Sequence, residues 1–199
     1  MINSRHRIVK SKCLLVSLII LFSITGCQKI IAQAVFNTQL ETLDEKTFNL
    51  SDWKNNKFTV VLFLLADCPA CQSYSLTLNN LTKQFSSCGV KFYGVFPGHY
   101  GTLQEDLEFK TNYKISFPLL RDPEKKISSL LHAKVAPEAF LIDRNGKVLY
   151  RGRIDDWMYA VGKKRIKINS NDLQNAISES CAGKDVSKPA TQAIGCIIE

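Results

Sequence analysis

Proline, glycine and histidine are scarce in this 199-residue sequence, and it has no long apolar stretch. The 6 prolines and 10 glycines are too few for a collagenous or low-complexity chain. A hydrophobic content of 45% is too high for a disordered chain. No internal repeat is visible that would indicate a solenoid. The sequence therefore predicts one globular domain with a sizeable core.

Acidic residues are absent from the first twelve positions, which carry four basic ones. The apolar run that follows, 13–22, is shorter than the roughly 20 residues that span a bilayer. This pattern predicts a secretory signal over 1–26. The sequence Ile-Thr-Gly-Cys ending at Cys27 resembles the lipobox of bacterial lipoproteins, which implies lipidation of Cys27. The alternatives are an ordinary signal peptide with a chance cysteine, or an uncleaved anchor.

The predicted product is lipid-anchored to a membrane of the bacterial cell envelope and faces the periplasm or extracytoplasmic space. We expect residues 27–34 to form a tether. Removing the signal lowers the net charge from +8 to +4, so the basic balance does not indicate a nucleic-acid binder. The remaining basic cluster, Lys163 to Lys167, has no interleaved exposed aromatics and reads as a solvated face or as attraction to an acidic partner or lipid headgroups.

Export changes the meaning of the seven cysteines. Cys13 leaves with the signal and Cys27 carries lipid. The other five lie in a compartment that permits disulfides. Because five is odd, at least one thiol is left over unless it meets another molecule.

The order of elements predicts an α/β fold. After a small hairpin with its turn at 44–46, a strand at 57–65 leads into a helix with one apolar face, which ends at Gly89. Further strands are expected at 90–96, 117–120, 139–142 and 148–153, and further helices at 103–113, 123–131 and 171–181. Asn145-Gly146 predicts a hairpin with a mirror-image turn. This order favours a central mixed sheet with helices on both faces, over a domain 35–183 followed by an irregular tail, 184–199.

Cys68 and Cys71 form a Cys-Pro-Ala-Cys motif between the buried strand and the helix. A helix N-terminus favours a thiolate, so Cys68 is the expected nucleophile. Cys71, one turn further on, would attack the mixed disulfide on Cys68 and release the product. A zinc site usually needs four ligands, and His6, His99 and His132 supply no second motif, so we predict no metal.

The strand, the Cys-Pro-Ala-Cys motif and Val135-Ala136-Pro137 together resemble the thioredoxin superfamily. The segments 137–143 and 150–156, with Gly195-Cys196, resemble its exported, peroxiredoxin-like (AhpC/TSA-type) redoxins. The resemblance implies a thioredoxin-like fold, no cofactor, and a cis peptide before Pro137 with Ala136 pairing with the substrate backbone. The implied activity is thiol-disulfide exchange with protein thiols or disulfides, recharged by an unidentified redox partner.

The sequence departs from three kinds of relative. Leu62 and Asp67 stand where thioredoxin has a buried aspartate and a tryptophan. A peroxiredoxin-like peroxidase is the closest alternative; it would use Cys71, but Cys68 and Leu64 replace the threonine and proline that such enzymes place before that cysteine. A copper-delivery module is the other alternative, but its cysteines are spaced differently and His132 is displaced; His132 is more simply the end of a short helix.

The remaining cysteines leave several pairings open. A Cys181–Cys196 bridge would close a loop of about 15 residues and stabilise the fold by roughly 3 kcal/mol. Alternatively, Cys196 on a mobile tail would reach the Cys68–Cys71 site as a third redox thiol. Cys88, at a helix end, reads as a packed small hydrophobe.

Overall fold

The structure is a computed structural model that describes residues 32–160 and 162–198. Cys13, Cys27 and the predicted signal peptide lie outside these residues. Among the described helices, none has the length and apolar character needed to cross a membrane.

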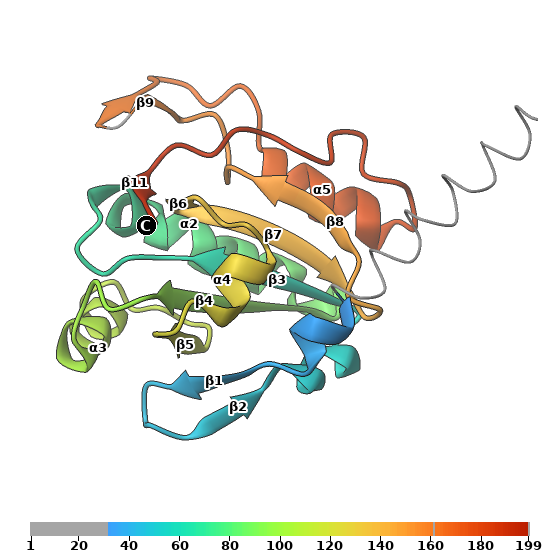
Figure 1. Cartoon of the computed structure of the whole chain (residues 1–199). Helices are drawn as coiled ribbons and strands as arrows, with labels where there is room; N and C mark the ends of the chain where they lie inside the picture. Colours follow the sequence, from blue (N-terminus) through green and yellow to red (C-terminus); the bar gives the residue numbers. More distant parts are fainter. Residues whose placement is uncertain (1–31, 161, 199) are drawn as a thin grey trace, which may run out of the picture.

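Seven strands form the central sheet, in the spatial order β2-β1-β5-β4-β3-β7-β8. Strands β3, β4 and β5 are parallel, whereas β7 and β8 add to β3 as an antiparallel pair. This arrangement confirms the predicted mixed sheet (Figure 1). The strands of this sheet are β1 (Gln39–Thr42), β2 (Thr47–Asn49), β3 (Phe58–Phe63), β4 (Val90–Pro97), β5 (Leu119–Asp122), β7 (Glu138–Asp143) and β8 (Val148–Gly152).

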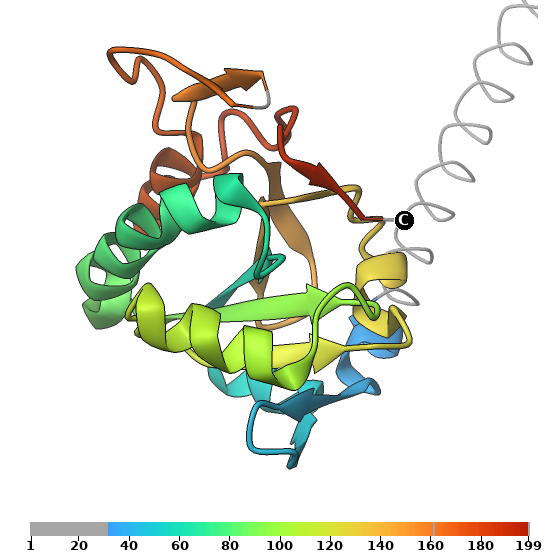
Figure 2. The same ribbon diagram turned by 90° about the vertical axis from the view of Figure 1, so that its left-hand side faces the viewer.

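Helices cover both faces of the sheet, as Figure 2 shows. Alternation along β3 divides the core: Val60 and Leu62 point to one apolar cluster, Val61 and Phe63 to the other. The first cluster is covered by α2 (Pro69–Phe85), α3 (Leu103–Asn112) and α5 (Asp172–Cys181), and the second by the 3-10 helix η1 (Leu50–Asn55) and α4 (Lys126–Leu130).

Sequence patterns located the main elements to within a few residues, but four details differ. Residues 32–36 are helical with Val35 buried, so the end of the predicted tether, 32–34, is part of the folded domain. Gly146 alone has positive φ in the β7–β8 turn, so the turn is not the mirror-image type. Asp143 stabilises the observed turn: its carboxylate accepts hydrogen bonds from the N–H groups of Asn145 and Lys147, both at 2.9 Å.

The other two differences concern the C-terminal third. A hairpin of β9 (Met158–Ala160) and β10 (Lys163–Lys164) carries the basic cluster. Aromatic rings do accompany these charges across the hairpin: Lys164 lies 4.4 Å from the Trp157 ring centroid and Arg165 lies 5.4 Å from that of Tyr159. The tail also differs from the irregular one expected, because β11 (Cys196–Ile197) pairs antiparallel with β6 (Val135–Ala136).

Candidate functional site

Cys68 lies where the sequence predicts it, between a central strand and a helix. It is the N-cap of α2, and Pro69 takes the first position of that helix. Proline suits this position because the N–H it lacks would have no partner there. The unpaired N–H groups of the first turn and the helix dipole favour a negative charge on the Cys68 sulfur.

Cys71 lies one turn inside the same helix. Both cysteines are buried in this structure, and Cys71 is the free cysteine of the described residues. Burial, with a smaller contribution from the nearby Asp67 carboxylate, raises the pKa of the Cys71 thiol to about 12. The Leu65 N–H opposes this shift by donating to Cys71 Sγ at 3.4 Å. Cys71 is therefore a thiol with almost no thiolate at neutral pH.

The segment before β7 brings a second part of the chain to Cys68. The Ala136–Pro137 peptide bond is cis, which confirms that prediction. Ala136 is buried, and its carbonyl oxygen lies 3.3 Å from Cys68 Sγ. The predicted site residues Cys68, Cys71, Ala136 and Pro137 thus meet at one end of the sheet.

Cys196 is the disulfide partner of Cys68. The two cysteines form a disulfide across 128 residues, while Cys71 stays unpaired. Cys196 is also the direct β-partner of Ala136, and the Ile198 N–H donates to the Lys134 carbonyl at 2.9 Å. The structure thus places Cys196 at the site, as one alternative expected, and its role as a third redox thiol stays a prediction. In this state Cys68 is not bonded to Cys71.

The second disulfide joins Cys88 to Cys181. The proposed Cys181–Cys196 bridge is therefore wrong, and so is the interpretation of Cys88 as an unpaired hydrophobe. The physical reason is packing: Cys88 follows α2 and Cys181 ends α5, and both helices cover the same face of the sheet. The prediction rested on the short sequence distance between Cys181 and Cys196, which does not reflect this packing of the helices.

The segment before Cys196 is fixed to strand β8. The Thr191 N–H donates to the Arg151 carbonyl and the Arg151 N–H donates to the Pro189 carbonyl, both at 3.0 Å. The Thr191 hydroxyl accepts from the Arg153 N–H at 3.0 Å and lies 2.6 Å from the Tyr150 hydroxyl. These contacts, which the sequence did not indicate, lead the chain end to the site.

A buried hydrogen bond positions the helix that carries the cysteines. The Tyr74 hydroxyl donates to Asp155 at 2.6 Å, and the same carboxylate oxygen accepts the Trp157 N–H at 2.8 Å. Burial raises the pKa of both Tyr74 and Asp155. This hydrogen bond thus ties α2 to the segment that follows β8.

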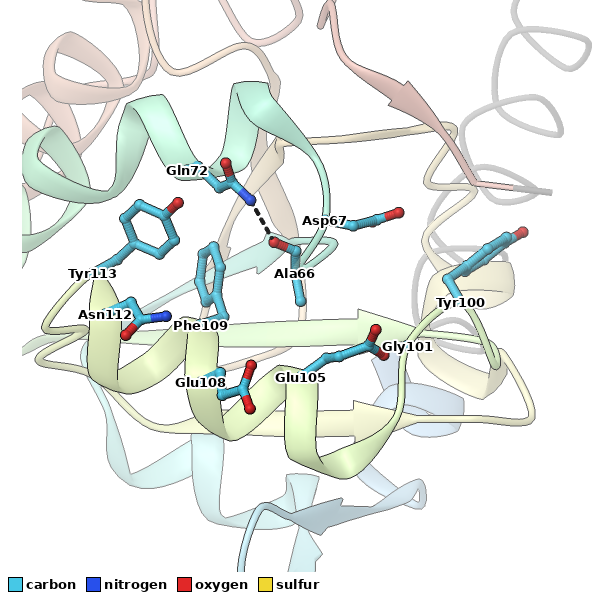
Figure 3. Close-up of a pocket in the computed structure, with 10 residues that line it drawn as sticks. All are labelled: Ala66, Asp67, Gln72, Tyr100, Gly101, Glu105, Glu108, Phe109, Asn112 and Tyr113. Carbon is cyan, nitrogen blue, oxygen red and sulfur yellow. Dashed lines mark hydrogen bonds between the residues drawn. The ribbon is translucent and has the colours of Figure 1, made fainter.

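A pocket of about 200 Å³ lies between α2 and α3, beside Ala66 and Asp67 (Figure 3). Asp67, Glu105 and Glu108 line it, so the loop before Cys68 has an acidic surface beside it. The Gln72 side chain donates to the Ala66 carbonyl at 2.9 Å and closes the upper wall. Across the described chain, no group of three His, Cys, Asp or Glu side chains is placed to hold a metal ion.

The fold and this site define the chain as a thioredoxin-fold protein, and solved structures agree in fold. A hypothetical protein from Sinorhizobium meliloti superposes with a TM-score of 0.73 at 23% identity, covering 82% of this chain and 91% of that one. A secreted Mycobacterium tuberculosis disulfide oxidoreductase has a TM-score of 0.53 at 16% identity, covering 74% of this chain and 96% of that one.

The AhpC/TSA family model matches residues 31–151, and the chain belongs to the AhpC/TSA family. Among curated proteins, chloroplastic peroxiredoxin Q of Oryza sativa subsp. japonica is 23% identical over 141 residues, which is 64% of each chain. The chain thus spans under two thirds of the length of this relative. Cys68, Cys71 and Pro137 lie inside the family match, whereas Cys181 and Cys196 lie beyond it.

Proposed function

We propose that this protein is a thiol-disulfide oxidoreductase that acts on protein thiols or disulfides, with Cys68 as its nucleophile. One observation carries the proposal: Cys68 is bonded to a cysteine in an extended strand that pairs with Ala136. A site that holds such a strand has the geometry needed for a mixed disulfide with a protein substrate. The family match and the likeness to a secreted disulfide oxidoreductase support the same activity.

The proposed reaction has two exchange steps. The Cys68 thiolate attacks one sulfur of a substrate disulfide, forming a Cys68–substrate bond and releasing the other substrate sulfur as a thiolate, which takes a proton. A second thiol of the protein then attacks Cys68 Sγ, gives up its proton and releases the rest of the substrate as a thiol. The substrate is reduced and the protein gains one disulfide. The reverse sequence oxidises a substrate dithiol, and the redox partner decides the direction.

The proposed location is the extracytoplasmic side of a bacterial membrane, with a lipid on Cys27. Two features support it: the basic and apolar start of the sequence ending at Gly26-Cys27, and two disulfides in the domain. Metabolic labelling with a palmitate analogue tests it. Label should enter the protein and be lost in Cys27→Ser; equal labelling of both forms would refute the anchor.

Substrate trapping tests the activity. In the variant Cys71→Ser/Cys196→Ser, Cys68 has no neighbouring thiol to resolve a mixed disulfide, so protein adducts should accumulate on non-reducing gels of envelope extracts. The matched control adds Cys68→Ser and should trap nothing. If the two variants give the same adducts, Cys68 is not the nucleophile and the proposal fails.

Peroxide reduction is the second candidate, favoured by the family and by the peroxiredoxin Q relative. In that mechanism Cys71 would attack the peroxide. Its buried thiol and raised pKa oppose this role. Hydrogen peroxide consumption that survives Cys68→Ser but not Cys71→Ser would favour the peroxidase over the exchange enzyme.

A further inference from the structure

The C-terminal segment occupies the edge that the proposed function assigns to the substrate. Residues 189–198, here called the C-terminal strap, run along β8 and end beside β6, close to the start of α2 (Figures 1 and 2). Cys196 pairs with Ala136, and Ile197 pairs with Val135. A substrate strand and the strap cannot both take the same backbone groups of β6.

We propose that Cys196 is the resolving cysteine of this protein, and that the strap expels the product as it closes the Cys68–Cys196 disulfide. This inference rests on the proposed function and assigns its second step to Cys196 rather than Cys71. The Cys196 thiolate attacks Cys68 Sγ in the Cys68–substrate disulfide, and the substrate sulfur leaves as a thiolate that takes up a proton. The product is the observed disulfide, with Cys71 still a thiol.

The two candidate resolving thiols differ in reactivity. Cys71 is completely buried, and its pKa is raised to about 12. Cys196 is half-buried, on a strand of two residues at the molecular edge. Thiol-disulfide exchange needs a thiolate, so the raised pKa makes Cys71 a slow attacking group at neutral pH. The higher intrinsic nucleophilicity of a high-pKa thiolate recovers only part of this loss.

Gly195 makes the close approach of the strap feasible. A Cβ atom at this position would overlap the carbonyl oxygen of Ala136 and lie 3.0 Å from the backbone nitrogen of Pro137. The obstacle is backbone, so it cannot move aside as a flexible side chain would. A glycine immediately before the cysteine is therefore a requirement of this docking mode, and we expect the same of protein substrates that take the strap's place.

Glutathione disulfide serves as the probe because its mixed disulfide with Cys68 is visible by intact mass and locatable by peptide mapping. The full-length protein is reduced, freed of reductant, mixed with the probe and quenched in acid at intervals. In the wild type and in Cys71→Ser, the glutathione adduct on Cys68 should be short-lived. In Cys196→Ser it should persist at least tenfold longer.

Gly195→Ala separates the docking geometry from the mere presence of a thiol. It retains every cysteine, yet it should prolong the adduct nearly as much as Cys196→Ser. Gln192→Ala, an exposed position of the strap, is the matched control and should resolve like the wild type. Prolongation in Cys71→Ser but not in Cys196→Ser would overturn the inference and leave the proposed function standing. No adduct on Cys68 in any variant would instead overturn the proposed function.

Discussion

The two disulfides of this domain have the same chemistry but lie at opposite ends of helices, in opposite electrostatic surroundings. Cys88 and Cys181 both lie at the C-terminal ends of helices, where the dipole disfavours a thiolate. Cys68 lies at the N-terminus of α2, where the dipole favours one. A disulfide is harder to open when the sulfur that leaves is a poor thiolate. The comparison therefore indicates a structural bond at Cys88–Cys181 and an exchanging bond at Cys68–Cys196.

The comparison holds only if Cys71 stays outside both disulfides. The pH dependence of Cys71 alkylation gives the largest expected effect. Alkylation needs the thiolate, which is the deprotonated form. With a pKa of about 12, the rate of Cys71 alkylation in the oxidised protein should rise about tenfold per pH unit, hence about a thousandfold from pH 7 to pH 10. Iodoacetamide labelling with peptide mass mapping measures it. A plateau near pH 9 would show an ordinary thiol and remove the reason for preferring Cys196.

Selective reduction tests the contrast directly. Under limiting dithiothreitol, the Cys68–Cys196 bond should open at least tenfold faster than Cys88–Cys181, because Cys68 at the start of α2 is the better leaving thiolate. Alkylating the released thiols at each time point and mapping them gives both rates in one sample. Equal rates, or faster opening of Cys88–Cys181, would contradict the division into structural and exchanging bonds.

Removing the structural bond should weaken the fold and spare the chemistry. The bond closes a span of 93 residues, and disulfides typically stabilise by about 2 to 4 kcal/mol. Cys88→Ala/Cys181→Ala should lower the free energy of unfolding in urea by about this amount. Its glutathione reaction at Cys68 should match the wild type under native conditions. Loss of that reaction in the folded variant would show that the second bond also belongs to the site.

The smallest expected effect comes from the charge beside the motif. The Asp67 carboxylate raises the pKa of Cys71. Asp67→Asn should lower that pKa by less than one unit and speed Cys71 alkylation at pH 8 by less than about tenfold. Glu108→Gln removes another carboxylate of the same pocket and serves as the control, with no change expected. A slower reaction in Asp67→Asn would show that the charge acts on Cys71 with the opposite sign.

Local sequence predicted the half of the site that lies within the first 137 residues. Cys68 and Cys71 follow a buried strand and begin an amphipathic helix, so spacing alone places them. The cis bond before Pro137 came from the family resemblance, because no local pattern separates cis from trans proline.

The other half depends on contacts between distant parts of the chain. Cys68 and Cys196 are 128 residues apart in the sequence. The strand that pairs the strap with β6 has only two residues, too few to show the alternation of apolar and polar residues that predicts a strand. With five cysteines, spacing does not determine connectivity. Gly195 was a visible signal beside Cys196, but its meaning depends on the backbone of Ala136, which only the fold supplies.

Disulfide mapping of the protein isolated from the cells that produce it tests the central claim most directly. Exchange is stopped with acid at lysis, free thiols are then alkylated in denaturant at neutral pH, the protein is digested without reduction, and linked peptides are identified by mass. The account predicts Cys68 linked to Cys196, Cys88 linked to Cys181, and Cys71 carrying the blocking group. Cys68 linked to Cys71, with Cys196 blocked, would contradict it.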